Sequence, residues 1–133
     1  PIRMNNTYAT DTMALILRLE KRKSSRKVKS IFEGVEKGKI TLLIPSMVLA
    51  EIGYLSERNK IDTNLQEVRD YCQTNPTAKI DPITAEVIYK SFEIDDIPEL
   101  HDRIIAGAAF HKKLELITND PIIIDSKYIS TIW

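Results

Sequence analysis

Four carboxylates in this sequence are spaced so that a fold could gather them at one place. They are Asp11, Glu51, Asp102 and Asp120. The first and the last follow apolar segments at 7–10 and 115–117 that predict strands, and the other two lie near the start of predicted helices. In an open α/β sheet, ligands bind beyond the carboxyl ends of the strands, where the strand order reverses. We therefore expect the four side chains to meet at one edge of a sheet.

A cluster of carboxylates indicates a hard metal ion. Like charges repel, and burying a charge without a partner is costly, so a fold tolerates such a cluster only with compensation. A divalent cation is the simplest compensation, and Mg²⁺ and Mn²⁺ prefer oxygen ligands. A soft site is not indicated, because Cys72 is the only cysteine and His101 and His111 lack the paired spacing of zinc ligands. The pattern therefore predicts a Mg²⁺ or Mn²⁺ site.

Each acid also has a purely structural interpretation. Asp11 suits the N-cap of a helix, where aspartate is favoured. Asp102, close to a helix start, would complement the helix dipole. Glu51 suits a solvated helix position, and Asp120, which precedes Pro121, suits a turn. Only the joint arrangement of the four acids favours a functional interpretation.

The hydrophobic periodicity divides the chain into alternating strands and helices. Strands are predicted at 7–10, 41–44, 78–80, 115–117 and 130–133, and helices at 12–21, 30–37, 84–93 and 101–113, with two more that begin at Ser46 and Asp62 as their N-caps. The face of 84–93 expected to be buried carries Val87, Ile88 and Phe92. This alternation predicts βαβ units and a three-layer α/β/α fold around a mainly parallel sheet.

Length and composition are those of one globular domain. The 133 residues are 43% hydrophobic and 29% charged, and such a length fits a single domain over 1–133. With no possible internal disulfide, no apolar run of the roughly 20 residues that span a bilayer and no secretory signal, we expect a cytoplasmic protein that does not contact the membrane. We expect Met4 to be the natural start, with residues 1–3 left over from cloning.

The formal net charge is zero, so overall charge does not predict nucleic-acid binding. Any such binding must come from local patches that the sum conceals. A basic run is the main candidate for phosphate contacts, and it comprises Lys21, Arg22, Lys23, Arg26, Lys27 and Lys29. Arg103, beside Asp102, is a second candidate. A solvated loop and helix face for the run, and a structural ion pair for Arg103, remain as alternatives.

The segments around the four acids resemble those of the PIN domain family. The resemblance covers nearly the whole chain in the right order. It is carried by Thr10-Asp11-Thr12 with Leu15, Ile44-Pro45-Ser46 through Glu51, Leu100-His101-Asp102-Arg103-Ile104-Ile105-Ala106, and Leu116-Ile117-Thr118-Asn119-Asp120. One position departs from the family: Met13 stands where members often have Asn or Ser, which removes a possible hydrogen bond beside the site.

The resemblance implies a sheet of order 3-2-1-4-5 and a Mg²⁺- or Mn²⁺-dependent endoribonuclease. That strand order would place the strands that precede Asp11 and Asp120 side by side. Small free-standing members are mostly VapC-like toxins of bacterial and archaeal toxin–antitoxin pairs. The resemblance therefore also implies an RNA substrate, a cognate antitoxin protein and a homodimer.

We expect metal-assisted hydrolysis of an RNA phosphodiester bond. Asp11 and Asp120 would bind the metal directly, and Glu51 and Asp102 would complete the site directly or through water. We expect Thr12 to orient Asp11, and Thr118 to bind a phosphate or a metal-bound water. Spare acids close in sequence are Asp96, Glu99 and Asp125.

Three other functions remain open at this stage. A PIN protein could process RNA for housekeeping, or could be a catalytically silent module that only binds a partner or RNA. A phosphotransfer domain on a similar sheet is the third. The residues argue against it, because haloacid-dehalogenase-type phosphatases need Asp-x-Asp where this chain has Asp11-Thr12-Met13. Receiver domains need an earlier acidic pair and a late lysine that are not convincingly present.

Overall fold

A computed structural model describes residues 6–133, so the expected start at Met4 lies outside the described residues. Within this range the sheet contains β1 (Thr7–Thr10), β2 (Thr41–Pro45), β3 (Ala78–Asp81), β4 (Leu116–Ile117) and β5 (Thr131–Ile132). The strand order is β3-β2-β1-β4-β5, and all neighbouring strands pair in parallel. The predicted order 3-2-1-4-5 is therefore confirmed.

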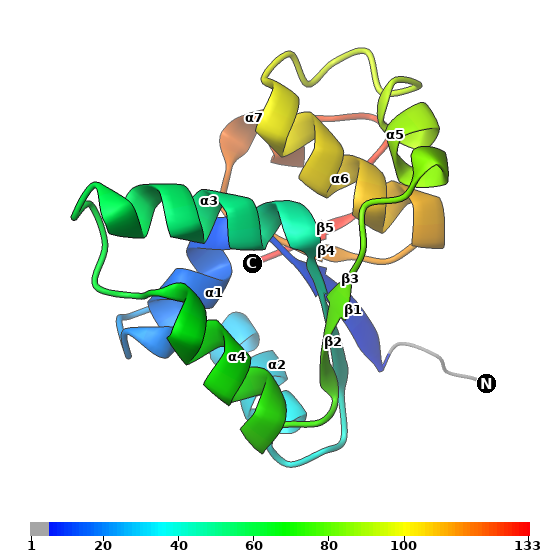
Figure 1. The fold of residues 1–133 in the computed structure, drawn as a ribbon. Coiled ribbons are helices and arrows are strands. Elements are labelled where there is room, and N and C mark those ends of the chain that lie inside the picture. Colours follow the sequence, from blue (N-terminus) through cyan, green and yellow to red (C-terminus); the bar gives the residue numbers. More distant parts are fainter. Residues whose placement is uncertain (1–5) are drawn as a thin grey trace.

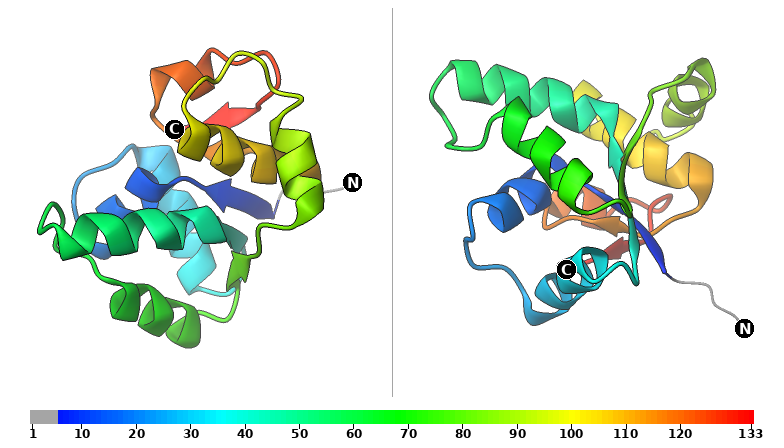
Figure 2. Two further views of the ribbon diagram at one scale, coloured as in Figure 1. Left: turned by 45° about the horizontal axis from the view of Figure 1, so that its top comes forward. Right: turned by 60° about the horizontal axis from the view of Figure 1, so that its bottom comes forward.

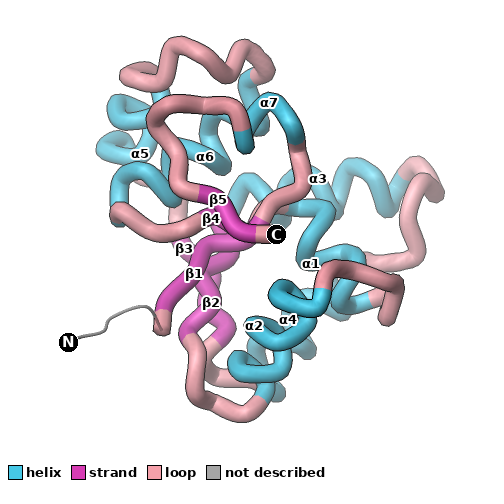
Figure 3. The backbone as a smooth tube through the Cα atoms, turned by 180° about the vertical axis from the view of Figure 1, so that it is seen from behind, coloured by secondary structure: helices cyan, strands magenta, loops and turns pink. Residues whose placement is uncertain are grey.

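Helices cover both faces of the sheet. They are α1 (Thr12–Leu19), α2 (Arg26–Glu36), α3 (Ser46–Glu57), α4 (Leu65–Thr74), α5 (Ala85–Ser91), α6 (Leu100–Lys112) and α7 (Pro121–Ile124). Figures 1 and 2 show α1, α2 and α4 on one side of the sheet and α5 and α6 on the other. Helix α3 contacts α1, α4 and α6. This is the predicted three-layer α/β/α architecture, and Figure 3 shows it from behind.

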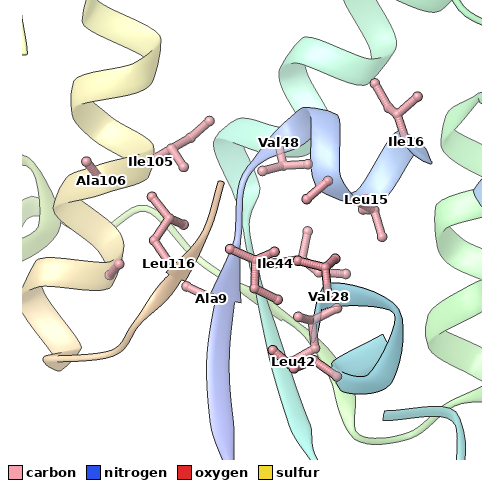
Figure 4. Close-up of a cluster of buried hydrophobic side chains, with 14 of the residues drawn as sticks. Ala9, Leu15, Ile16, Val28, Leu42, Ile44, Val48, Ile105, Ala106 and Leu116 are labelled. Carbon is pink, nitrogen blue, oxygen red and sulfur yellow. The ribbon is translucent and has the colours of Figure 1, made fainter. Parts of the chain in front are cut away.

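The strands are buried on both faces, as expected of a parallel sheet between two helical layers. Figure 4 shows Leu15 and Val28 on one side of β1 and Ile105 on the other. Leu42 and Leu116, on the strands that flank β1, have no exposed surface. The core therefore continues through the sheet and holds the helices of both layers against it.

The chain changes direction across the sheet beside β1. Strands β1, β2 and β3 follow one another outward, and the chain then returns over α5 and α6 to place β4 on the free side of β1. The backbone N–H of Asp11 donates to the carbonyl of Ile117 at 3.1 Å. The ends of β1 and β4 are thus adjacent, at the point where ligands bind in such sheets.

Two predicted helix starts are wrong. Helix α2 begins at Arg26 rather than Ser30, because the Ser25 hydroxyl accepts the N–H of Val28 and caps it. Helix α4 is capped by Asn64, which exchanges hydrogen bonds with Glu67 in a capping box, and not by Asp62. In both places the residues around the N-cap are basic or polar, so the hydrophobic pattern did not mark where the helix begins.

Ser46, Phe92 and the segment after Asp120 also differ from the prediction. Ser46 lies inside α3, and its hydroxyl accepts the N–H of Ile83 instead of capping the helix. Phe92 is 54% exposed, because its ring faces the Arg103 guanidinium rather than the core. The turn expected at Asp120 opens the short helix α7.

Helices α5 and α6 pack closely where Gly107 lies against Ser91. A methyl group at Gly107 would come within 2.7 Å of the Ser91 Cβ and 2.8 Å of its Cα. Ser91 is fully buried and its backbone cannot yield. We expect Gly107→Ala to lower the free energy of unfolding by about 1–3 kcal/mol, as overpacking typically does. Urea denaturation would measure the loss.

Gly53→Ala in α3 is the matched control. A methyl group there would meet only the partly exposed side chain of Leu65, at 3.3 Å, which can move. Since alanine has the higher helix propensity by up to about 1 kcal/mol, this variant should be neutral or slightly more stable. Equal losses in both variants would contradict the close contact of α5 with α6.

Candidate active site

Asp11 and Asp120 each follow a strand and also cap the helix that comes next in the chain. Asp11 follows the last residue of β1 and accepts the N–H of Ala14 at 2.8 Å, which caps α1. Asp120 follows β4 and accepts the N–H of Ile122 at 2.8 Å, which caps α7. The structural interpretation of Asp11 as an N-cap and its expected place at the carboxyl edge of the sheet are therefore both correct.

Glu51 and Asp102 reach the same place from α3 and α6. Asp102 lies in the first turn of α6, where the Glu99 side chain caps the helix and accepts the Asp102 N–H at 2.8 Å. The Asp102 carboxylate is therefore not needed for capping. Glu51 accepts a hydrogen bond from the hydroxyl of Thr12. Thr12 thus holds Glu51, whereas the sequence suggested that it orients Asp11.

One cavity of about 360 Å³ is lined by all four acids. Its other lining residues are Thr12, Met13, Leu55, Ile105, Asn119 and Trp133. The acids come from four elements that are far apart in sequence, so only the fold brings them together. Trp133 both packs against the core and lines this cavity, a place that no pattern in the sequence indicated.

The carboxylates influence one another electrostatically. Burial raises the pKa of Asp11 to about 6, and the nearby Asp120 and Glu51 charges add to the rise, against hydrogen bonds from Thr118 and Ala14 that lower it. Burial, followed by the charge of Asp120 and those of other acids, raises the pKa of Asp102 to about 6 as well. Within residues 6–133 none of the four acids forms a salt bridge, so the cavity concentrates their carboxylates without a cationic side chain paired to them.

Thr118 connects the two acids at the strand ends. Its side chain has no exposed surface. The hydroxyl accepts the backbone N–H of Asp120 at 3.1 Å and hydrogen-bonds the Asp11 carboxylate. Thr118 therefore lies against both acids, and its expected contact with a phosphate or a metal-bound water stays a prediction.

A sequence model of the PIN domain matches residues 8–126. The chain belongs to the PIN domain family. A comparison with curated proteins gives no match. None of the helices within residues 6–133 of this PIN domain is both long and apolar enough to cross a membrane.

Solved structures share the fold of this PIN domain at low sequence identity. VapBC2 from Rickettsia felis, bound to a DNA fragment from its promoter, has a TM-score of 0.73 at 20% identity and covers 96% of this chain and 98% of its own. DNA-bound VapBC from Salmonella typhimurium has a TM-score of 0.67 at 16% identity, and the match covers 97% of this chain and 98% of its own. A toxin–antitoxin complex from Klebsiella pneumoniae has a TM-score of 0.63 at 19% identity, and the match covers 95% of this chain and 96% of its own.

The donor set of the PIN domain suits a hard cation, although the acids are not arranged around one. All four candidate ligands offer carboxylate oxygens, the type that Mg²⁺ and Mn²⁺ prefer. Within residues 6–133, however, no three side chains of the His, Cys, Asp or Glu type lie close enough together to hold a metal ion as they stand. Mutual repulsion keeps carboxylates apart, and a cation would relieve it.

The basic residues do not line the acidic cavity. Lys21, Arg22, Lys23, Arg26 and Lys29 line a separate groove of about 1030 Å³, which reaches Tyr71 of α4. Lys27 is exposed on α2 and is not part of the groove wall. Arg103 donates from Nε to the Ser91 carbonyl at 3.1 Å, so its guanidinium has a structural contact.

The spare acids have structural partners outside the cavity. Asp96 accepts the Ser126 hydroxyl at 2.7 Å and the Lys127 N–H at 2.9 Å. Glu99 caps α6, and Asp125 follows the last residue of α7. None of the three lines the acidic cavity.

We expect Asp11→Asn to stabilise the metal-free protein at neutral pH. The folded-state pKa of Asp11, about 6, exceeds its ordinary value of 3.8, so stability falls as pH rises from about 4 to about 6 and stays low above. Asparagine keeps the cap of α1 without the charge. Urea denaturation in EDTA at pH 7.5 should show a gain of roughly 1–2 kcal/mol.

Asp96→Asn is the control for this measurement. Hydrogen bonds to the backbone of Lys127 and to Ser126 lower the pKa of Asp96, so its charge is favourable in the folded state. Its removal should reduce stability above pH 4. A loss of stability in both variants would contradict the electrostatic description of the cavity.

Proposed function

We propose that this PIN domain is a metal-dependent endoribonuclease that hydrolyses RNA phosphodiester bonds with Mg²⁺ or Mn²⁺. One observation carries the proposal: Asp11, Glu51, Asp102 and Asp120 line a single cavity at the carboxyl edge of the sheet. The raised pKa values of Asp11 and Asp102 support it, because they reflect the burial of the two carboxylates and, after it, the negative charge of their neighbours, and a bound cation would offset both.

Asp11 and Asp120 would hold the ion directly, and Glu51 and Asp102 would complete the site directly or through water. When bound by these residues, a divalent cation would supply a water molecule of lowered pKa as the nucleophile at neutral pH. Thr118 would steady Asp11 and Asp120 through its buried hydroxyl. Thr12 donates a hydrogen bond to the Glu51 carboxylate and so helps to hold it at the cavity. These contacts reduce the number of side chains that must reorder around the ion.

The basic groove would bind the RNA backbone. It begins where α1 ends, and α1 begins beside Asp11. The eight residues of α1 span about 12 Å at 1.5 Å each, so one RNA strand could occupy both places. Lys21, Arg22, Lys23 and Arg26 would then contact phosphates of nucleotides beyond the cleaved bond, without reading sequence. The contact of Arg103 with Ser91 makes that arginine a weaker candidate.

The structural neighbours support a toxin role. They are toxin–antitoxin complexes whose chains match this one over nearly their full length. We propose that this protein is the toxin of such a pair, that it binds a cognate antitoxin protein, forms a homodimer and acts in the cytoplasm as one domain. A housekeeping role in RNA processing is the alternative that uses the same site.

A catalytically silent binding module is favoured by one observation. Although the four carboxylates line one cavity, no three of them within residues 6–133 lie close enough together to hold a metal ion. If they cannot close around a cation, the protein would keep the fold and bind a partner without cleaving RNA. Metal titration and cleavage separate the two functions.

The proposed activity is tested by incubating a mixed RNA pool with the protein in Mg²⁺, Mn²⁺ or EDTA. We expect cleavage with either metal and none in EDTA. Asp11→Asn and Asp102→Asn should each lower the rate by about 100-fold or more, since even a residue that only orients a metal ligand contributes about 10- to 100-fold. Gel analysis of end-labelled RNA would follow the products.

Asp125→Asn is the matched control, because Asp125 is an exposed aspartate outside the cavity. It should cleave at the wild-type rate. If the wild type cleaves nothing and its unfolding temperature does not respond to Mn²⁺, the silent module is the better description. If all variants cleave alike, the site lies elsewhere.

The basic groove is tested through salt dependence. Each phosphate contact with single-stranded RNA contributes about 0.7 to the slope of log affinity against log salt. The double variant Lys23→Ala/Arg26→Ala should therefore reduce the slope by about 1.4. Fluorescence anisotropy with a labelled RNA and the inactive Asp102→Asn background would measure it.

The control removes two exposed lysines that do not line the groove, Lys39 and Lys60. It changes the net charge equally, so it reports any effect of overall charge. Identical slopes in the two double variants would show that the RNA does not follow the groove.

A further inference from the structure

A second cavity adjoins the acidic one. It has a volume of about 530 Å³ and is lined by Met47, Ala50, Glu51, Tyr54 and Leu55 of α3 and by His101 of α6. Glu51 and Leu55 line both cavities. The two spaces therefore meet along α3, and a molecule bound at the acids can extend into the second one.

Helix α3 packs most of its apolar side chains against the core, but it leaves the Tyr54 ring exposed. Val48 and Ile52 are fully buried in the core. Leu55 follows Ile52 on the same face, whereas Met47 and Tyr54 lie two helical turns apart on a neighbouring face, where the Tyr54 side chain is 55% exposed. Tyr54 therefore leaves exposed apolar surface at the second cavity, and such surface is a candidate binding site.

The lining of the second cavity matches the chemistry of a nucleobase. Tyr54 offers an aromatic ring, and the Arg58 guanidinium lies over one face of that ring, 3.7 Å from its centre. Met47 and Leu55 offer apolar walls, while the His101 ring, whose Nδ1 pairs with the Glu99 carboxylate, can hydrogen-bond the polar edge of a base through Nε2. Proteins bind single-stranded RNA through aromatic rings on which bases stack.

The size and position of the cavity favour a base over a protein partner. A stable protein interface buries about 800 Å² on each partner, which needs a broad surface rather than a cavity beside the acids. A cavity of about 530 Å³ has room for a base, and its shared wall with the acidic cavity suits a nucleotide whose phosphate lies at the acids.

We propose that this second cavity binds the base of a nucleotide next to the cleaved phosphodiester bond, with the base stacked on Tyr54. This inference rests on the proposed ribonuclease function and assigns a base-binding role to α3 that the four acids do not require. Tyr54 would then influence which bonds are cleaved, through the neighbouring base, while the acids carry out the hydrolysis.

The first test compares cleavage of a short single-stranded RNA by the wild type and by variants of Tyr54. We expect Tyr54→Ala to lower kcat/KM by roughly 10-fold, the scale of one lost stacking contact, and Tyr54→Phe to retain near wild-type activity. Tyr89→Ala is the matched control, since Tyr89 is 69% exposed on α5 and lines neither cavity. It should behave like the wild type.

The second test removes the base instead of the ring. The RNA carries an abasic nucleotide on the 5′ or the 3′ side of the cleaved bond. One of these substitutions should lower the wild-type kcat/KM about as much as Tyr54→Ala does, roughly 10-fold. The same abasic substitution should not lower the kcat/KM of the Tyr54→Ala variant any further, because that variant already lacks the stacking contact. If Tyr54 had only a structural role, the Tyr54→Ala substitution and the abasic nucleotide would each lower kcat/KM independently, and their effects would multiply.

The outcomes separate this inference from the proposed function. If the wild type cleaves RNA but neither abasic substitution affects it, the base site is wrong and the nuclease stands. If the wild type neither cleaves nor binds RNA, both fail. If Tyr54→Ala changes the molar mass in light scattering and leaves the abasic effect unchanged, the face is an interface between protein chains, and the base site is overturned.

Discussion

The parallel pairing of β4 with β1 is the constraint on which the candidate site depends. Because the chain returns over α5 and α6 to the free side of β1, the ends of two strands more than 100 residues apart in sequence become neighbours. The Asp11 N–H bonds the Ile117 carbonyl, and the next residue, Thr118, joins the two acids. With another strand order Asp11 and Asp120 would lie apart, and the four acids would no longer share one cavity.

The site is built from groups that also stabilise the local fold. Asp11 and Asp120 cap α1 and α7, so each carboxylate has one oxygen engaged by a backbone N–H. Capping accounts for the presence of each acid but not for their gathering in one cavity, where burial and repulsion raise the pKa of Asp11 and Asp102. A cluster that costs stability in the metal-free state is typical of a functional site.

Charge and apolar surface are arranged separately around this cluster. The basic groove lies beyond the far end of α1, and the cavity with Tyr54 lies along α3. The net charge of zero therefore conceals an acidic centre and a basic flank. This arrangement is the one on which the proposed RNA substrate rests, because a small substrate would need only the central cavity.

The sequence by itself determined the strands, their ends and most helices, because hydrophobic period and local capping act between near neighbours. It placed Asp11 and Asp120 at strand ends on those grounds alone. It missed the start of α2, where Ser25 caps the helix inside a run of basic residues, and the exposure of Phe92, which depends on Arg103. The strand order came from the family resemblance rather than from periodicity.

Only the tertiary structure decided which side chains meet. Thr12 contacts Glu51 across 39 positions, and Trp133 reaches the acidic cavity from the end of the chain. It also placed the basic run in a separate groove and set Tyr54 beside the acids. No local pattern encodes such contacts, because they arise when the packing of α3 and α6 against the sheet fixes distances between segments that are remote in sequence.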